Sequence, residues 1–204
     1  MTSPEGDLVQ KDLLYQRAIS LEYFTVAWCV VEVIVALAAG IKAGSVALVA
    51  FGLDSAIEVV AAASVLWRFK QSALDAQRAE DWSAKAVGAT FFGLAGFVGY
   101  ESVTDLYFRR APQESLPGII LAAAALAIMS LLGISKRSLA TKLSSRVLLA
   151  DSAESLACAY FSAALLLGLV LNAWLRWWWA DPAAAVAIAA LMVREGFEIF
   201  SGGE

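Results

Sequence analysis

Residues 45–69 read SVALVAFGLDSAIEVVAAASVLWRF and decide the fold. The stretch is long and apolar enough to cross a membrane as one helix, because a spanning helix needs about 20 mostly apolar residues. It contains two acids, Asp54 and Glu58, which lie four residues apart and therefore on one face of the helix. A charged side chain at the centre of a bilayer costs at least ~2.5 kcal/mol. The pair therefore predicts a polar path or an ion site within the membrane.

The composition of the whole chain agrees with a membrane protein. Of its 204 residues, 60% are hydrophobic and 17% are charged, whereas a soluble domain has about 45–50% apolar and about 25% charged residues. The net charge of −4 gives no indication of nucleic-acid binding. The chain has no histidine, which removes the commonest transition-metal ligand. Cys29 and Cys158 lie in separate apolar runs, a pattern that does not indicate a disulfide framework.

Five further segments are long enough and apolar enough to span a bilayer. We therefore predict an all-α integral membrane protein with six transmembrane helices over residues 19–204, preceded by a polar cytoplasmic lead-in at residues 1–18. The expected helices are approximately Leu21–Ala39, Val46–Phe69, Ala84–Leu106, Leu116–Ile134, Val147–Leu171 and Asp181–Phe200.

The positive charges predict how these helices are oriented. With six spans, both termini lie on one side of the membrane, and that side holds eleven of the fifteen Lys and Arg residues. One of its loops is the short basic segment Lys136–Arg146, between the fourth and fifth helices. Because cytoplasmic loops carry the excess of Lys and Arg, we expect both termini to be cytoplasmic.

Helix geometry brings two further side chains to the depth of the acids. With a rise of 1.5 Å per residue, Asp54 lies about 12 Å and Glu58 about 18 Å below the outer edge of the membrane. In the antiparallel fifth helix, Glu154 lies about 10 Å and Cys158 about 16 Å above the inner edge of a core roughly 30 Å thick. The four side chains are thus expected at one level near the midplane.

Carboxylate oxygen and thiolate sulfur are both Zn²⁺ ligands, so these four side chains predict a tetrahedral metal site. Two simpler interpretations stay open at this point. Asp54 and Glu58 would then only hydrogen-bond to neighbouring helices. Cys158 would be a small apolar core residue, as free cysteines often are.

Two more acids lie within the predicted spans. Asp151 comes one turn before Glu154, nearer the inner surface, and is either an entry-path acid or a solvated acid favoured by the helix dipole. Glu32 falls in the middle of the first helix and is either a proton relay or a packed hydrogen-bonding group.

The acids near the outer ends of the helices have ordinary explanations. We expect Glu101 and Asp105 to be solvated. Asp181 precedes a proline that suits the first turn of a helix, so we expect it to act as the N-cap of the sixth helix.

The ordered set of motifs resembles the cation diffusion facilitator (cation efflux) family. Residues 45–58 are similar to the second transmembrane helix of that family, which carries an Asp-x-x-x-Asp metal motif. Residues 149–154 and onward resemble the fifth helix, whose motif has His or Asp, three residues, and then Asp. Residues 180–182 followed by 191–196, Leu-Met-Val-Arg-Glu-Gly, resemble the sixth helix. The resemblance covers nearly the whole chain.

The resemblance implies which residues bind the metal. Its motifs fall on Asp54 and Glu58 in the second helix and on Glu154 and Cys158 in the fifth. Glu58 stands where the family has Asp, and Glu154 and Cys158 stand where it has a His/Asp pair. A thiolate ligand favours Zn²⁺ or Cd²⁺ over Mg²⁺. The sequence given ends at Glu204, so we expect a short member without the family's cytoplasmic C-terminal domain, forming homodimers through its membrane helices.

Membership of this family implies a transporter and not an enzyme, with no cofactor. The expected activity is efflux of a divalent metal ion, zinc or cadmium, in exchange for protons, across a cell membrane such as a bacterial inner membrane. The expected partners are the metal ion, protons and the lipid bilayer. One alternative is a membrane metal sensor or partner subunit that does not transport. Another is a proton-coupled carrier of an organic cation, which does not need Cys158.

Overall fold

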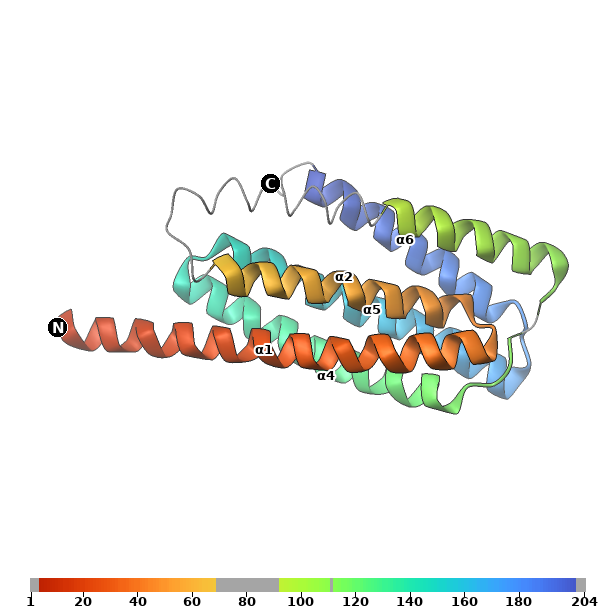
Figure 1. The fold of residues 1–204 in the computed structure, drawn as a ribbon, viewed down its shortest axis with the longest axis horizontal. Helices are drawn as coiled ribbons and strands as arrows, with labels where there is room; N and C mark the ends of the chain where they lie inside the picture. Colours follow the sequence, from red (N-terminus) through yellow and green to blue (C-terminus); the bar gives the residue numbers. More distant parts are fainter. Residues whose placement is uncertain (1–3, 69–91, 111, 201–204) are drawn as a thin grey trace.

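The computed structural model describes residues 4–68, 92–110 and 112–200, and all regular structure in this part of the chain is helical (Figure 1). The prediction of an all-α fold with six helices is confirmed. Five helices are labelled in Figure 1, and a further helix runs over residues 92–108. The labelled helices are α1 (Pro4–Ala43), α2 (Val46–Arg68), α4 (Leu116–Leu143), α5 (Arg146–Leu175) and α6 (Ala180–Phe200).

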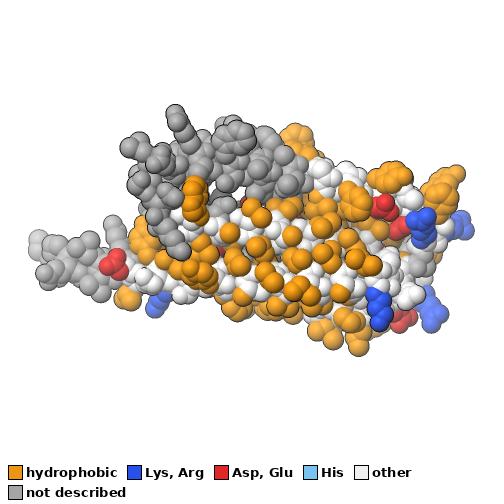
Figure 2. Space-filling view, viewed as in Figure 1, with side chains coloured by type: hydrophobic (Ala, Val, Ile, Leu, Met, Phe, Trp, Pro, Cys, Tyr) orange, Lys and Arg blue, Asp and Glu red, His pale blue; other side chains and the backbone are white. Residues whose placement is uncertain are grey.

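Four of these helices contain segments that are long and apolar enough to cross a membrane. The segments are Asp12–Ala43, Val46–Trp67, Leu116–Leu143 and Asp151–Leu175. Hydrophobic side chains cover the middle of the face seen in Figure 2, whereas many of the charged side chains gather toward its ends. A broad exposed apolar surface of this kind is typical of a protein in contact with lipid.

Helices α1 and α4 extend well beyond their predicted bounds. α1 begins at Pro4 instead of near Leu21, because proline suits the first helical turn and the following polar residues are mostly good helix formers. Its first part extends beyond the other described helices in Figure 1. α4 continues past Ile134 to Leu143, where Ser144 ends it in a left-handed conformation with a φ of 51°. Residues 84–91 of the expected third helix lie outside the described residues.

Asp181 caps a different helix from the one expected. α6 already begins at Ala180, so Asp181 lies inside its first turn and is not its N-cap. Its buried carboxylate instead accepts hydrogen bonds from Ser45 Oγ at 2.5 Å and from Ala47 N at 3.4 Å. Ser45 Oγ in turn accepts from Leu48 N at 3.1 Å. The first turn of α2 is therefore fixed by an acid from α6, which satisfies N–H groups that have no partner within the helix.

α2 and α5 lie at the centre of the bundle. α2 packs against α1, α5 and α6, while α5 packs against α4, α2 and α6. The helix over residues 92–108 lies beside α6 (Figure 1), and the rings of Phe92 and Phe197 meet edge to face with centroids 5.1 Å apart. The two helices that carry the predicted ligands are thus direct neighbours, enclosed by the other elements.

Small residues permit the close approach of α5 and α6. A Cβ atom added at Gly168 would lie 2.6 Å from Ala184 Cβ, closer than van der Waals contact allows. Without a hydrophobic driving force between helices in lipid, such close packing is a main source of their association.

We expect Gly168→Val to destabilise the protein by about 1–3 kcal/mol, because overpacking forces the two helices apart. Gly96→Val is the matched control, since a Cβ added there has nothing within 4 Å. Thermal unfolding in detergent, followed by circular dichroism, measures both. Equal stability of the two variants would contradict the tight α5–α6 contact.

Candidate metal centre

A small cavity separates α2 from α5 near the middle of both helices. Its volume is about 10 Å³, roughly the space that one water molecule requires. All four predicted ligands line it. The lining residues are Asp54, Ile57 and Glu58 from α2, and Glu154, Ala157, Cys158 and Phe161 from α5.

The cavity combines acidic ligands with apolar walls. Asp54, Glu58 and Cys158 are buried, with 4%, 5% and 2% of their surface exposed, and Glu154 is partly buried. The remaining wall consists of isoleucine, alanine and phenylalanine side chains. Carboxylates in such surroundings are costly unless a cation or a proton compensates their charge. The chemistry of the cavity therefore favours a small cation.

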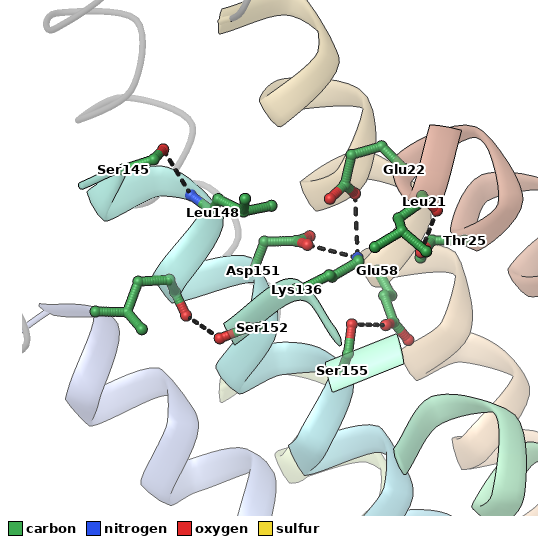
Figure 3. Close-up of polar contacts among 11 residues, drawn as sticks. Leu21, Glu22, Thr25, Glu58, Lys136, Ser145, Leu148, Asp151, Ser152 and Ser155 are labelled. Carbon is green, nitrogen blue, oxygen red and sulfur yellow. Dashed lines mark hydrogen bonds and ion pairs between the residues drawn. The ribbon is translucent and has the colours of Figure 1, made fainter. Parts of the chain in front are cut away.

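Glu58 belongs to the lining of the cavity and also lies close to residues of helix α1. Its Oε1 accepts a hydrogen bond from Ser155 Oγ of α5 at 3.2 Å (Figure 3). Its Oε2 is buried and has no hydrogen-bond partner among the described residues. A buried acceptor without a partner costs about 1–3 kcal/mol, and more when it is charged. This oxygen is therefore free to take a proton or a metal ion.

On the α1 side, Glu58 meets a second group of potential ligands. One ligand atom each from Cys29, Glu32 and Glu58 lie within 4.8 Å of one another, and all three residues are buried. Glu32 also accepts hydrogen bonds from Trp28 Nε1 at 2.5 Å and from Ser55 Oγ at 3.0 Å. The packed hydrogen-bonding interpretation of Glu32 is thus what the structure displays, while a relay function stays a prediction.

A buried ionic triad lies next to Glu58. Lys136 Nζ is 2.5 Å from Asp151 Oδ2 and 3.1 Å from Glu22 Oε2. Figure 3 shows the two carboxylates converging on the ammonium group. The three side chains are 0–2% exposed. Two predictions are wrong here: Asp151 is not a solvated acid, and Lys136 is not in a basic loop, because α4 continues through it.

Sequence reasoning missed Glu22, Cys29 and Lys136. Glu22, Cys29 and Glu32 follow one another at spacings of seven and three residues, which place them on one face of a helix. That spacing was a usable signal. For Lys136, the signal was the lack of any Gly or Pro between Ile134 and Leu143 to end the helix.

The expectation that Glu101 and Asp105 are both solvated is only half right. Glu101 is partly exposed, but Asp105 is buried, with 7% of its surface accessible. Its Oδ1 lies 3.6 Å from Nη1 of Arg110, which follows the end of the same helix. The burial of Asp105 is thus accompanied by a charge partner from its own segment.

The comparisons with known proteins agree with this geometry. The chain matches the family described as "Cation efflux transmembrane domain" over residues 23–202. It is 30% identical to the cation-efflux pump FieF of Shewanella oneidensis over 60% of this chain and 41% of that protein. It is 28% identical to the uncharacterized transporter sll1263 of Synechocystis over 71% of this chain and 49% of that protein.

A third relative is transmembrane protein 163 of Xenopus laevis, with 23% identity over 90% of this chain and 66% of that protein. The chain therefore spans about two fifths to two thirds of the length of these curated relatives. The family is one of membrane transporters and not of enzymes, and the matched region includes every predicted ligand. On these grounds the chain belongs to the cation efflux transmembrane domain family.

Proposed function

We propose that the protein exports a divalent metal ion, Zn²⁺ or Cd²⁺, from the cytoplasm in exchange for protons. The observation that carries the proposal is the cavity between α2 and α5, where three carboxyl groups and a thiol from two neighbouring helices face one small space. The membership of the cation efflux family and the similarity to a cation-efflux pump support it.

The size and chemistry of the cavity favour a dehydrated metal ion over an organic cation. A space of about 10 Å³ has room for little more than one water-sized particle. Zn²⁺ is commonly held by four ligands, with bonds of about 2.0–2.2 Å to carboxylate oxygen and about 2.3 Å to thiolate. Asp54, Glu58, Glu154 and Cys158 supply that donor set.

Protons are the natural counter-ions at such a site. The ligands must be deprotonated to bind the metal, so metal and protons compete for the same atoms. A fully protonated set of carboxyl and thiol groups is neutral, so the empty cavity can change the side to which it opens without burying a net charge. Alternation of the cavity between the two sides of the membrane then exchanges metal for protons.

The orientation and assembly belong to the same proposal. We place both termini in the cytoplasm, which puts the outer end of α2, with Ser45, on the opposite side. The exposed apolar side chains of the membrane helices would accommodate a second copy of the chain in a homodimer. Asp151 would then lie nearer the cytoplasmic end of the path than the cavity does.

Metal flux in proteoliposomes tests the proposal directly. With purified protein and a Zn²⁺-sensitive dye inside the vesicles, we expect uptake that rises with an outward-directed proton gradient. A Zn²⁺ flux that does not change with the proton gradient would contradict antiport. Stoichiometric metal binding without any flux would instead identify a membrane metal sensor, the main competing function.

Cys158→Ser should change metal preference more than transport itself. A hydroxyl is a poorer ligand than thiolate for soft ions, so we expect cadmium affinity to fall at least about tenfold more than zinc affinity. Competition binding of the two metals to purified protein measures the ratio. An unchanged Cd²⁺/Zn²⁺ ratio would remove Cys158 from the proposed ligand set and leave it as a core residue.

A further inference from the structure

The group formed by Cys29, Glu32 and Glu58 shares Glu58 with the lining of the α2–α5 cavity. It joins α1 to α2, and none of its three residues is exposed by more than 5%. The Cys29 thiol is free of any disulfide. We propose that these three residues form a second binding position for a thiophilic divalent cation, which shares Glu58 with the cavity.

The spacing of the ligand atoms fits a metal ion. Around tetrahedral Zn²⁺, bonds of about 2.0–2.3 Å place neighbouring ligand atoms about 3.3–3.8 Å apart. The three ligand atoms already lie within 4.8 Å of one another without an ion between them. Small side-chain movements are therefore enough to close the site.

A second, independent observation points to a ligand at this place. Glu58 Oε2 is buried and has no hydrogen-bond partner among the described residues. The other oxygen, Oε1, accepts from Ser155 on the α5 side. The Glu58 carboxylate therefore has one oxygen that is hydrogen-bonded to α5 and one that has no partner among the described residues. This arrangement suits a carboxylate that contributes to both the cavity and the second binding position.

Glu32 is held in place for this role by two donors. Trp28 Nε1 donates to its Oε1 and Ser55 Oγ donates to its Oε2. Each carboxylate oxygen has two lone pairs, so a hydrogen bond leaves room for a metal bond. Outer hydrogen bonds of this kind orient ligands in metal sites, and losing them typically lowers affinity 10–100-fold. The Trp28 and Ser55 contacts thus orient Glu32 within the second binding position, which we call the α1 position.

This inference rests on the proposed function only for the nature of the cation, and the two are tested separately. The chain has two cysteines, and each belongs to a different position: Cys29 to the α1 position and Cys158 to the cavity. The ultraviolet charge-transfer absorption of cadmium thiolate therefore reports on one position at a time in single cysteine variants of the full chain.

We expect Cys158→Ser protein to retain cadmium-thiolate absorption from Cys29. Adding Glu32→Gln to that variant should weaken cadmium binding at least about tenfold. Glu114→Gln in the same background is the matched control, because Glu114 is an exposed acid outside both positions, and it should change nothing.

The outcomes separate the two claims. Absorption in Cys29→Ser protein but none in Cys158→Ser protein would overturn the α1 position and leave the cavity intact. The reverse result would support the α1 position and remove Cys158 from the proposed transport site. Absorption in Cys158→Ser protein that is indifferent to Glu32→Gln would also overturn the α1 position, since Glu32 would then not be a ligand.

Discussion

Asp54→Ala is expected to reduce metal flux to the level of protein-free vesicles. The substitution removes one carboxylate from a buried cavity whose remaining ligands cannot move to replace it, because they lie on packed helices. Loss of an outer hydrogen bond alone lowers metal affinity about 10–100-fold, so loss of a direct ligand should lower it at least about 100-fold.

The control and the readout distinguish a site effect from a folding effect. Glu114→Ala changes an exposed acid and should transport like the unmodified chain. Calorimetric metal binding to purified Asp54→Ala protein, measured beside its thermal stability, shows whether affinity falls while the fold persists. Flux at the unmodified level in a folded Asp54→Ala protein would refute the cavity as the transport site.

Lys136→Met is expected to lower the free energy of unfolding by about 3–5 kcal/mol, the usual result of removing one partner from a buried ion pair. It leaves Glu22 and Asp151 buried with no cation between them, since both currently contact the Lys136 ammonium group. Denaturant-induced unfolding in mixed micelles measures the change. Lys142→Met, on an exposed residue in the last turn of the same helix, is the control.

A compensating variant shows whether charge is the cause. Combining Lys136→Met with Glu22→Gln and Asp151→Asn removes all three charges together, and neutral replacements of buried ion pairs are often tolerated. We therefore expect the triple variant to be more stable than Lys136→Met alone. If Lys136→Met were as stable as Lys142→Met, the triad would have no stabilising role.

The convergence of Asp54, Glu58, Glu154 and Cys158 could be predicted because membranes restrict geometry. The rise per residue of a helix and the thickness of the bilayer are nearly constant. The depth of a residue then follows from its distance to the end of its span. That arithmetic placed four side chains from two antiparallel helices at one level, and the structure places them around one cavity.

The ionic triad could not be predicted in the same way. Glu22 and Lys136 are 114 residues apart in the chain, and nothing in either local sequence specifies the other. Lys136 follows an apolar run and looks like the start of a basic loop until its partners are known. Its burial depends on how α1, α4 and α5 pack together, which is tertiary information. The same holds for Asp181, which caps α2 from 134 residues away.

The hydrogen bonds between Asp181 of α6 and the first turn of α2 give this helix a fixed point about which it can tilt. Asp181 holds Ser45 and Ala47 at one end of α2, while both of its predicted ligands lie further along. From Val46, Asp54 is about 12 Å and Glu58 about 18 Å distant along the axis. If α2 swings like a lever about this anchor, Glu58 moves half as far again as Asp54. A small tilt would therefore move Glu58 away from α5 by a larger distance than Asp54. Glu58 would then be the first of the two carboxylates to lose its contact with a metal ion held by α5.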